Sequence, residues 1–222
     1  MNAREFKDAV FGQFARMAQA FASPKRLEIL DVLAQGERDV ETLARETSQS
    51  VVNASRHLQV LKNVRLVEGR KQGVHVFYRL ADSDVVFCWE SLQKLAEKRS
   101  AEVRDIARRY FAERDGLEPI SLKELLKRAG SGEVIVLDVR PPEEYASGHI
   151  RGSLSVPLAE LRRRLNSLAK DHEIVAYCRG PYCVLAAEAV ALLRRSGRAA
   201  RRLAEGYPAW RAAGQPIEKG RG

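Results

Sequence analysis

Apolar positions in the first third of the chain recur at helical intervals. Between residues 3 and 22 they lie three or four positions apart, which predicts a helix with one aromatic face. The residues on that face are Phe6, Val10, Phe14, Met17 and Phe21. They either pack into a core or form a dimer interface. Ser23-Pro24, an N-cap residue followed by proline, begins a second helix over 24–34.

The next stretch predicts two helices and a hairpin. A short helix is expected over 40–46, and a second over 49–62, capped by Ser48, with Val52, Leu58 and Leu61 facing inward. Side chains then alternate over 64–68 and 74–80, which predicts two strands joined by Gly69-Arg-Lys-Gln-Gly73. Arg70 and Lys71 are expected at the tip of this hairpin.

One long helix is expected from Asp82 to about Arg114. Its apolar side comprises Val85, Val86, Trp89, Leu92, Leu95 and Ala96. Roughly 30 residues is far above the mean helix length of about 11–12. A terminal helix of this length needs a partner, most simply its own symmetry mate.

The second half of the chain has a different pattern, in which short apolar runs alternate with helical periodicity. Strands are expected at 134–137 and 174–177, and the helices at 121–129, 161–169, 184–195 and 208–213. This alternation predicts an α/β domain with a parallel sheet flanked by helices. Asp115-Gly-Leu-Glu-Pro119 breaks the preceding helix. We therefore predict two domains, a mainly α winged helix-turn-helix domain over 1–114 and the α/β domain over 120–222, joined by a linker over 115–119.

Composition narrows the classes of protein to consider. The chain has 222 residues and a net charge of +9, which favours an anionic partner. No apolar run approaches the roughly 20 residues of a membrane span, and the first residues lack the apolar core of a signal peptide. Three cysteines do not make a disulfide framework, which predicts a cytoplasmic location. The sequence predicts neither a membrane partner nor a cofactor.

The two helices over 40–62 form a helix-turn-helix pattern. Outward side chains on the second helix are short and polar or cationic, and they could reach base edges and phosphates. A solvated helix face is the alternative, but a basic hairpin directly behind the helix favours DNA binding. The predicted DNA-contacting residues are Gln49, Ser50, Asn53, Ser55, Arg56 and His57 on the helix, with Arg70 and Lys71 on the hairpin.

This order of elements resembles the ArsR/SmtB family of winged-helix repressors. The resemblance is carried by Ser23-Pro24-Lys-Arg-Leu-Glu-Ile-Leu30, by Ser50-Val-Val-Asn-Ala-Ser-Arg-His-Leu-Gln-Val-Leu61, and by Leu66-Val67 with Tyr78-Arg-Leu80. It implies a homodimer, joined through the first and last helices, that reads a palindromic operator. Metal-sensing members carry paired cysteines where this chain has residues 36–43, which contain none, so we predict no metal site. Cys88 is either a core residue or a lone thiol that responds to sulfur species or oxidants.

The segment from Ile174 to Val184 carries the candidate chemistry. A strand ends at Cys178, a tight Gly-Pro turn follows, and a helix begins after Cys183. Backbone amides and the positive end of a helix dipole point at such a position, so we expect an exposed Cys178 thiol whose pKa is lowered by these donors and by Arg179. A small buried apolar residue is the alternative for Cys178.

These residues resemble the rhodanese domain over about Ile120 to Glu218. The motifs are Asp138-Val-Arg-Pro-Pro-Glu-Glu-Tyr-Ala-Ser-Gly-His-Ile-Arg-Gly152, the Cys178 loop and Gly206-Tyr-Pro-Ala-Trp210. The resemblance implies that Cys178 is a nucleophile that carries a persulfide between a sulfur donor and an acceptor thiol. The predicted site residues are Cys178, Arg179, Gly180, Tyr182, Cys183, Asp138 and Arg140. Asp138 and Arg140 could be catalytic, although a structural pair is favoured, and His149 is expected to pack.

The length of the loop separates sulfur chemistry from phosphate chemistry. A phosphatase of the Cys-x5-Arg type needs a guanidinium six positions after its nucleophile, where this chain has Val184. The six residues from Cys178 to Cys183 therefore suit sulfur. Cys183 either resolves the Cys178 persulfide as a disulfide or sulfur bridge, or packs inward as the helix begins.

Together the two motif sets predict a DNA-binding transcriptional regulator, a repressor, whose rhodanese-like domain senses or transfers sulfane sulfur through a Cys178 persulfide. A small sulfur donor and a thiol acceptor are the implied partners. The alternative is a sulfurtransferase tethered to a DNA-binding domain, with no signal passing between them.

Overall fold

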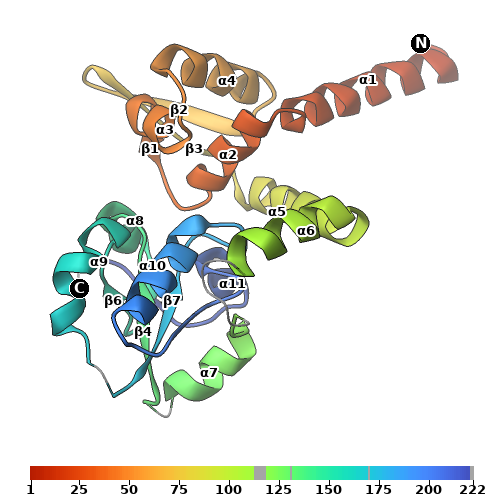
Figure 1. Cartoon of the computed structure of the whole chain (residues 1–222). Coiled ribbons are helices and arrows are strands. Elements are labelled where there is room, and N and C mark those ends of the chain that lie inside the picture. The colour runs from red at the N-terminus through yellow and green to blue at the C-terminus, as the bar shows by residue number, and fades with distance from the viewer. Residues whose placement is uncertain (113–118, 131, 170, 221–222) are drawn as a thin grey trace. The chain divides into compact units, whose positions relative to one another are not determined.

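The computed structural model describes residues 1–112, 119–130, 132–169 and 171–220, which divide into two compact units, Met1–Ala96 and Glu97–Gly222 (Figure 1). Apart from Pro119, the linker predicted over 115–119 lies outside the described residues, and the boundary placed there stays a prediction. Among the described residues, no helix has both the length and the apolar character to cross a membrane.

The first unit is a winged helix-turn-helix fold. Its elements are α1 (Ala3–Phe21), α2 (Pro24–Leu33), β1 (Arg38–Asp39), α3 (Val40–Glu46), α4 (Val51–Asn63), β2 (Val67–Gln72), β3 (His75–Leu80) and most of α5 (Ser83–Arg99). The strands form an antiparallel sheet in the order β1-β3-β2. Leu43, Leu58 and Leu61 are fully buried in the core between the helices and this sheet.

Two details of the first unit correct the sequence predictions. Helix α4 begins at Val51 with Ser50 as its N-cap, because the Ser50 hydroxyl accepts a hydrogen bond from the amide of Asn53. Ser48, the predicted cap, instead has a φ of 50°. Val52, predicted to face inward, is 62% exposed; Ala54 is the buried residue one turn before Leu58.

The hairpin turns later than predicted. Strands β2 and β3 pair from Val67–Leu80 up to Gln72–His75, so only Gly73 and Val74 form the turn. Gly73 has a φ of 61°, which a two-residue hairpin turn favours. Arg70 and Lys71 therefore lie within β2, opposite Phe77 and Val76, rather than at the tip.

The long helix expected from Asp82 to Arg114 is two helices. α5 ends at Arg99 and α6 spans Ala101–Ala112. Ser100 interrupts the helix, because its hydroxyl accepts a hydrogen bond from the Val103 amide and thereby caps α6. The Arg104 side chain donates to the carbonyls of Glu97 and Lys98, which satisfies acceptors at the end of α5.

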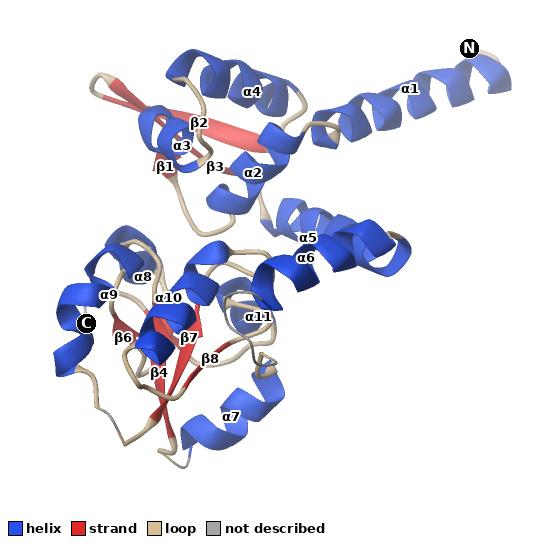
Figure 2. Ribbon diagram, viewed as in Figure 1, coloured by secondary structure: helices blue, strands red, loops and turns tan. Residues whose placement is uncertain are grey.

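The second unit has the predicted α/β architecture. After α6 its elements are α7 (Leu122–Gly130), β4 (Val134–Asp138), α8 (Pro142–Ser147), β5 (His149–Ile150), β6 (Leu154–Ser155), α9 (Leu158–Arg164), the 3-10 turn η1 (Leu165–Ser167), β7 (Glu173–Tyr177), α10 (Val184–Arg195), β8 (Ala200–Arg202), α11 (Tyr207–Ala212) and β9 (Ile217–Glu218). The main sheet is parallel in the order β6-β4-β7-β8 (Figure 2). Strand β5 pairs with β9.

Both faces of the parallel sheet are buried. Along β4, Val134 and Val136 pack on one side with α7 and α11, whereas Leu137 packs on the other with α9 and α10. This alternation follows from the two-residue period of a strand. The sheet therefore fixes the carboxyl end of β7, where Cys178 begins the loop to α10.

Candidate functional site

The cysteine loop joins the carboxyl end of β7 to the first turn of α10. Cys178 directly follows the strand, and Cys183 is the N-cap residue of α10. The amide of Cys183 donates to the Gly180 carbonyl at 3.1 Å, which closes the loop into a tight turn. This turn brings the two cysteine side chains together, and they hydrogen-bond to each other. Both thiols are free.

Cys178 is buried, contrary to the exposed thiol predicted above. Its side chain is 2% exposed and belongs to the apolar cluster formed by β4, β7, α9 and α10. The Sγ atom donates to the Cys183 carbonyl at 3.6 Å. Burial raises the pKa of Cys178 well above its usual value, and the hydrogen bond to Cys183 raises it further. The amides of Ala186 and Gly180 act in the opposite direction but do not offset the cost of burying a charge.

Cys183 has the property that was predicted for Cys178. The hydrogen bond with Cys178 lowers the pKa of Cys183, and the backbone amides of Arg179 and Leu185 lower it further despite burial. The loop therefore holds a pair of thiols that differ in acidity. When the pair loses one proton, Cys183 carries the thiolate and Cys178 remains the neutral donor.

Arg179 is held by Glu144 rather than by Cys178. Its Nη2 atom lies 2.6 Å from Oε1 of Glu144, whose side chain on α8 is fully buried. The guanidinium contributes to lowering the pKa of Cys183. That Arg179 also stabilises a Cys178 thiolate stays a prediction.

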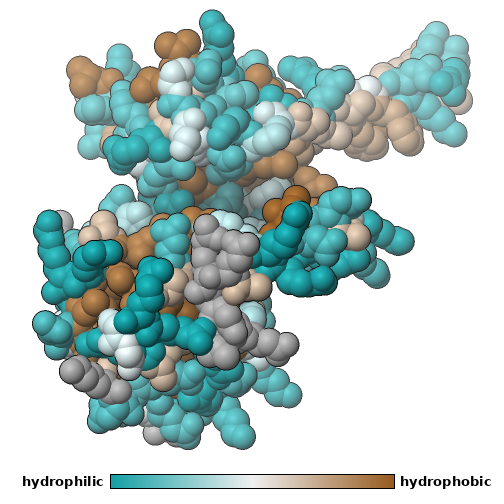
Figure 3. Space-filling model, viewed as in Figure 1, coloured by the Kyte–Doolittle hydropathy of each residue, from teal (hydrophilic) through white to brown (hydrophobic). Residues whose placement is uncertain are grey.

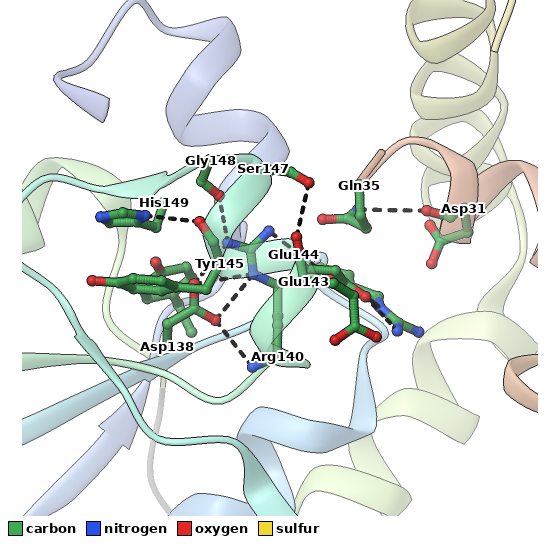
Figure 4. A network of polar contacts seen from close by, with 12 residues as sticks. Asp31, Gln35, Asp138, Arg140, Glu143, Glu144, Tyr145, Ser147, Gly148 and His149 are labelled. Atoms are coloured by element: carbon green, nitrogen blue, oxygen red, sulfur yellow. Dashed lines mark hydrogen bonds and ion pairs between the residues drawn. The ribbon is translucent and has the colours of Figure 1, made fainter. Parts of the chain in front are cut away.

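Asp138 and Arg140 form a fully buried ion pair at the carboxyl end of β4 (Figure 4). Arg140 donates through Nη2 to Oδ2 of Asp138 at 2.7 Å and to the Gly148 carbonyl at 2.8 Å, and its guanidinium lies 4.3 Å from the centre of the Tyr207 ring. All of these contacts are internal to the fold. Their geometry is that of a pair that ties β4 to α8 and α11.

His149 packs, as expected. Its ring stacks on that of Tyr145 at a centroid distance of 3.6 Å, and Nδ1 lies 2.8 Å from the Tyr145 carbonyl (Figure 4). The side chain is buried. These contacts leave the ring in a structural position between α8 and β5.

Two residues that position the site lie within the motifs quoted above but were not predicted as site residues. Glu144, described above, was one of two adjacent glutamates on a short helix, and no pattern marked it as buried. Gly206 has a φ of 81°, and a Cβ there would lie 2.6 Å from the Gly180 nitrogen and 2.7 Å from the Cys178 carbonyl oxygen. The next amide, that of Tyr207, donates to the Cys178 carbonyl at 2.9 Å. The Gly206-Tyr207 motif therefore holds the cysteine loop in place.

Of the residues predicted to contact DNA from α4, some are exposed and others are half-buried or hydrogen-bonded within the fold. Asn53 and Arg56 on α4 are exposed, whereas Ser55 and His57 are half-buried. Burial lowers the pKa of His57, with a further contribution from Arg26. Gln49 precedes α4 and donates to the Thr47 hydroxyl at 2.7 Å, and Ser50 caps the helix. Val51 and Val52, which were not among the predicted DNA-contacting residues, are 46% and 62% exposed at the start of α4.

The other residues singled out in the sequence of the first unit lie on the hairpin and on α5. Arg70 is exposed, but it donates to the carboxylate of Glu37, whose Oε2 lies 2.6 Å from Nη2 of Arg70. Lys71 is also exposed. Cys88 on α5 is exposed, so its assignment to the core was wrong. Within the described residues, no group of three or more His, Cys, Asp or Glu side chains is arranged to hold a metal ion.

Comparison with known proteins separates the same two parts of the chain. Residues 23–69 match the family model described as bacterial regulatory protein, arsR family, and residues 121–213 match the rhodanese-like domain. HTH-type transcriptional regulator Rv0324 of Mycobacterium tuberculosis is 44% identical over 214 residues, which cover 96% of this chain and 94% of that protein. A sulfurtransferase of Allochromatium vinosum is 33% identical over 40% of this chain and 82% of its own length.

Solved structures also resemble the first unit. The solution structure of the homodimeric winged helix-turn-helix domain of Mb0332 from Mycobacterium bovis, described as a possible ArsR-family regulator, is 40% identical. It covers 46% of this chain and 93% of its own, with a TM-score of 0.42.

Proposed function

Because the chain belongs to the arsR family of bacterial regulatory proteins and carries a rhodanese-like domain behind its winged helix, we propose that it represses transcription under the control of sulfane sulfur. The winged helix binds operator DNA, and the cysteine loop receives the sulfur as a persulfide that comes to rest on Cys178. The persulfide changes the affinity for the operator. The protein acts in the cytoplasm as a homodimer joined through α1 and α5.

The observation that carries this proposal is the hydrogen-bonded thiol pair in the loop after β7. A thiolate is the reactive form of cysteine, and the lowered pKa of Cys183 favours a thiolate there, beside a partner whose pKa is raised. The amides of Gly180 and Ala186 act to lower the pKa of Cys178, against the larger effect of burial. The same amides would stabilise a terminal sulfur anion on that residue. A loop with these features suits a sulfur atom that is accepted, held and passed on.

Operator binding is supported by the exposed side chains of the winged helix. Asn53 and Arg56 are free to face a major groove, and Arg70 and Lys71 lie on the strand that leads to the hairpin turn. The exposed Val51 and Val52 add apolar contacts at the start of α4. Arg70 and Lys71 supply the sequence-independent attraction to phosphates.

A route from the loop to the winged helix runs through α5. Tyr182 in the loop is half-buried, and burial together with the nearby Glu97 carboxylate raises its pKa. Glu97 lies in the last turn of α5, and one further contact ties this helix to α2, since Trp89 Nε1 donates to Oδ1 of Asp31 at 3.1 Å. A sulfur atom added to the loop displaces Tyr182, and α5 carries the displacement to the dimer interface and the recognition helices.

A reporter assay tests this function in cells. The promoter region of the chain's own gene is fused to a reporter, and polysulfide is added to cells that carry either wild-type protein or the Cys178→Ser variant. We expect polysulfide to change expression in the wild type and in Cys88→Ser, but not in Cys178→Ser. A response that survives Cys178→Ser would overturn the proposal. A wild type that gains the persulfide without any change in expression would instead favour the tethered sulfurtransferase.

A further inference from the structure

The two thiols of the loop differ in their access to a sulfur donor. Cys178 is 2% exposed and is enclosed by apolar residues that include Val139 and Ala186. Cys183, at the start of α10, is only partly buried. A thiolate must approach the donor's outer sulfur along the bond that breaks, which requires an open path to the attacking Sγ. Of the two residues, Cys183 is the more exposed, although it also packs against the edge of the same apolar cluster.

Cys183, the more exposed of the two cysteines, is also the one that loses its proton more readily. The hydrogen bond from Cys178 and the amides of Arg179 and Leu185 lower the pKa of Cys183, whereas burial raises that of Cys178. Cys183 therefore keeps its thiolate to lower pH than an ordinary cysteine, and Cys178 keeps its proton to higher pH. Access and charge thus both favour a first reaction at Cys183.

We propose that Cys183 is the first acceptor of sulfane sulfur, and that Cys178 receives the sulfur from Cys183 inside the loop. This inference rests on the proposed function and assigns the order of the two cysteines within it. It also reconciles two observations that otherwise conflict, namely the burial of Cys178 and the resemblance that makes Cys178 the bearer of the persulfide.

Two steps complete the transfer from a low-molecular-weight persulfide, R–S–SH. In the first, the Cys183 thiolate attacks the outer sulfur of the donor, a new S–S bond forms on Cys183, the S–S bond of the donor breaks, and R–S⁻ leaves. The donor is reduced by two electrons and Cys183 is oxidised by two. The product is Cys183–S–SH.

In the second step the sulfur moves between the cysteines. The Cys178 sulfur attacks the outer sulfur of Cys183–S–SH, and the bond between the two sulfurs on Cys183 breaks. The proton that Cys178 loses passes to the departing Cys183 sulfur, its hydrogen-bonding partner in the loop. The products are Cys178–S–SH and Cys183–SH, so the step needs no outside oxidant or reductant.

Single-turnover loading of the full-length protein tests this order. Wild type, Cys178→Ser, Cys183→Ser and Cys88→Ser are mixed with glutathione persulfide, quenched by alkylation at intervals, and mapped by peptide mass spectrometry. We expect Cys178→Ser to retain the added sulfur on Cys183. We expect Cys183→Ser to load Cys178 more slowly than wild type by about tenfold or more, because it lacks the accessible thiolate. Cys88→Ser should match the wild type.

A measurement on the unmodified protein guards against a folding defect in the variants. Brief iodoacetamide pulses at a series of pH values should alkylate Cys183 before Cys178 at every pH, with the labelling of Cys183 persisting to the lower pH. If Cys183→Ser loads Cys178 as fast as the wild type does, or if iodoacetamide labels Cys178 first, the proposed order of the two cysteines is overturned. The proposed function would still stand. A wild type that takes up no sulfur would overturn both.

Discussion

At the scale of single residues, the position of the cysteine loop depends on contacts that come from distant parts of the chain. The loop from Cys178 to Cys183 is local, but the amide of Tyr207 holds the Cys178 carbonyl, and Glu144 holds Arg179. Those partners are tens of residues away in the sequence. The sequence predicted the strand, the tight loop and the helix around Cys178, but it could not show that residues of β4, α9 and α10 bury this thiol and thereby raise its pKa.

Gly206→Ala should disable the loop. A Cβ at this position would lie within 3 Å of both the Gly180 nitrogen and the Cys178 carbonyl oxygen, and the left-handed backbone adds strain. We expect a loss of about 2–5 kcal/mol in the free energy of unfolding, from strain plus overpacking, and loss of sulfur loading. Urea unfolding and persulfide mass spectrometry measure the two effects.

Gly214→Ala is the matched control for that substitution. Gly214 also has a positive φ, of 67°, but nothing lies within 4 Å of its Cβ position. This variant should lose only about 1–2 kcal/mol and should load sulfur normally. Equal effects of the two substitutions would show that backbone strain alone, rather than contact with the cysteine loop, matters at Gly206.

At the scale of elements, the bounds of two helices could be predicted to the residue, whereas the start of a helix with two competing caps could not. Helices α3 and α10 have the predicted bounds, Val40–Glu46 and Val184–Arg195. The start of α4 was misplaced because Ser48 and Ser50 are both good caps and only the backbone decides between them. The break at Ser100 was missed because one serine in a polar helix carries no signal until Arg104 and Val103 are seen to bond around it.

Glu37→Gln should strengthen operator binding. Glu37 accepts two hydrogen bonds from Arg70, and this pairing lowers the pKa of Glu37, so the carboxylate stays charged well below neutral pH and competes with DNA phosphates for the guanidinium. Removing that charge should tighten binding by about two- to fivefold at low salt, as expected for release of an exposed pair. Fluorescence anisotropy on an operator fragment measures the change.

The Arg70→Gln background provides the control for this effect. Without Arg70 there is no guanidinium to release, so Glu37→Gln should add little, and Arg70→Gln alone should weaken binding and reduce the salt dependence. An equal gain from Glu37→Gln in both backgrounds would mean that the carboxylate acts on DNA directly and not through Arg70.

At the scale of the whole molecule, the first helix leaves an apolar face open. Phe6, Phe11, Phe14 and Met17 on α1 are 40–66% exposed, and Figure 3 shows the apolar colour along this helix at the upper right. The sequence predicted the helix and its aromatic face but left core and dimer as alternatives. Phe21, at the end of the same face, packs against the core. For the exposed residues the core alternative is removed, and we infer that a second copy of the chain covers them.

Phe14→Glu should therefore separate the dimer. A charge placed at the centre of this face is incompatible with burial against a partner, so we expect monomers in analytical ultracentrifugation and weaker operator binding. Gln19→Glu makes a comparable charge change about 140° around the same helix, at 100° per residue, and should remain dimeric. A dimeric Phe14→Glu variant with full operator affinity would contradict the interface.

Glu97→Gln should uncouple the two units without disabling either. Glu97 touches neither sulfur nor DNA, but its carboxylate lies near Tyr182 in the cysteine loop. Sulfur loading and operator binding by the untreated variant should match the wild type, whereas the change in affinity on loading should shrink. Glu90→Gln, on the same helix, is the matched control. If Glu97→Gln keeps the full response, the signal travels by another route.

The most direct test of the central claim is the operator affinity of the full-length protein before and after it gains a persulfide. Fluorescence anisotropy is measured on a fragment of its own promoter, with the Cys178 persulfide verified by mass spectrometry and then removed by dithiothreitol. We predict a reversible change of about fivefold or more, the lower range of allosteric coupling, in wild type and not in Cys178→Ser. Equal affinities of loaded and unloaded wild type would contradict the account.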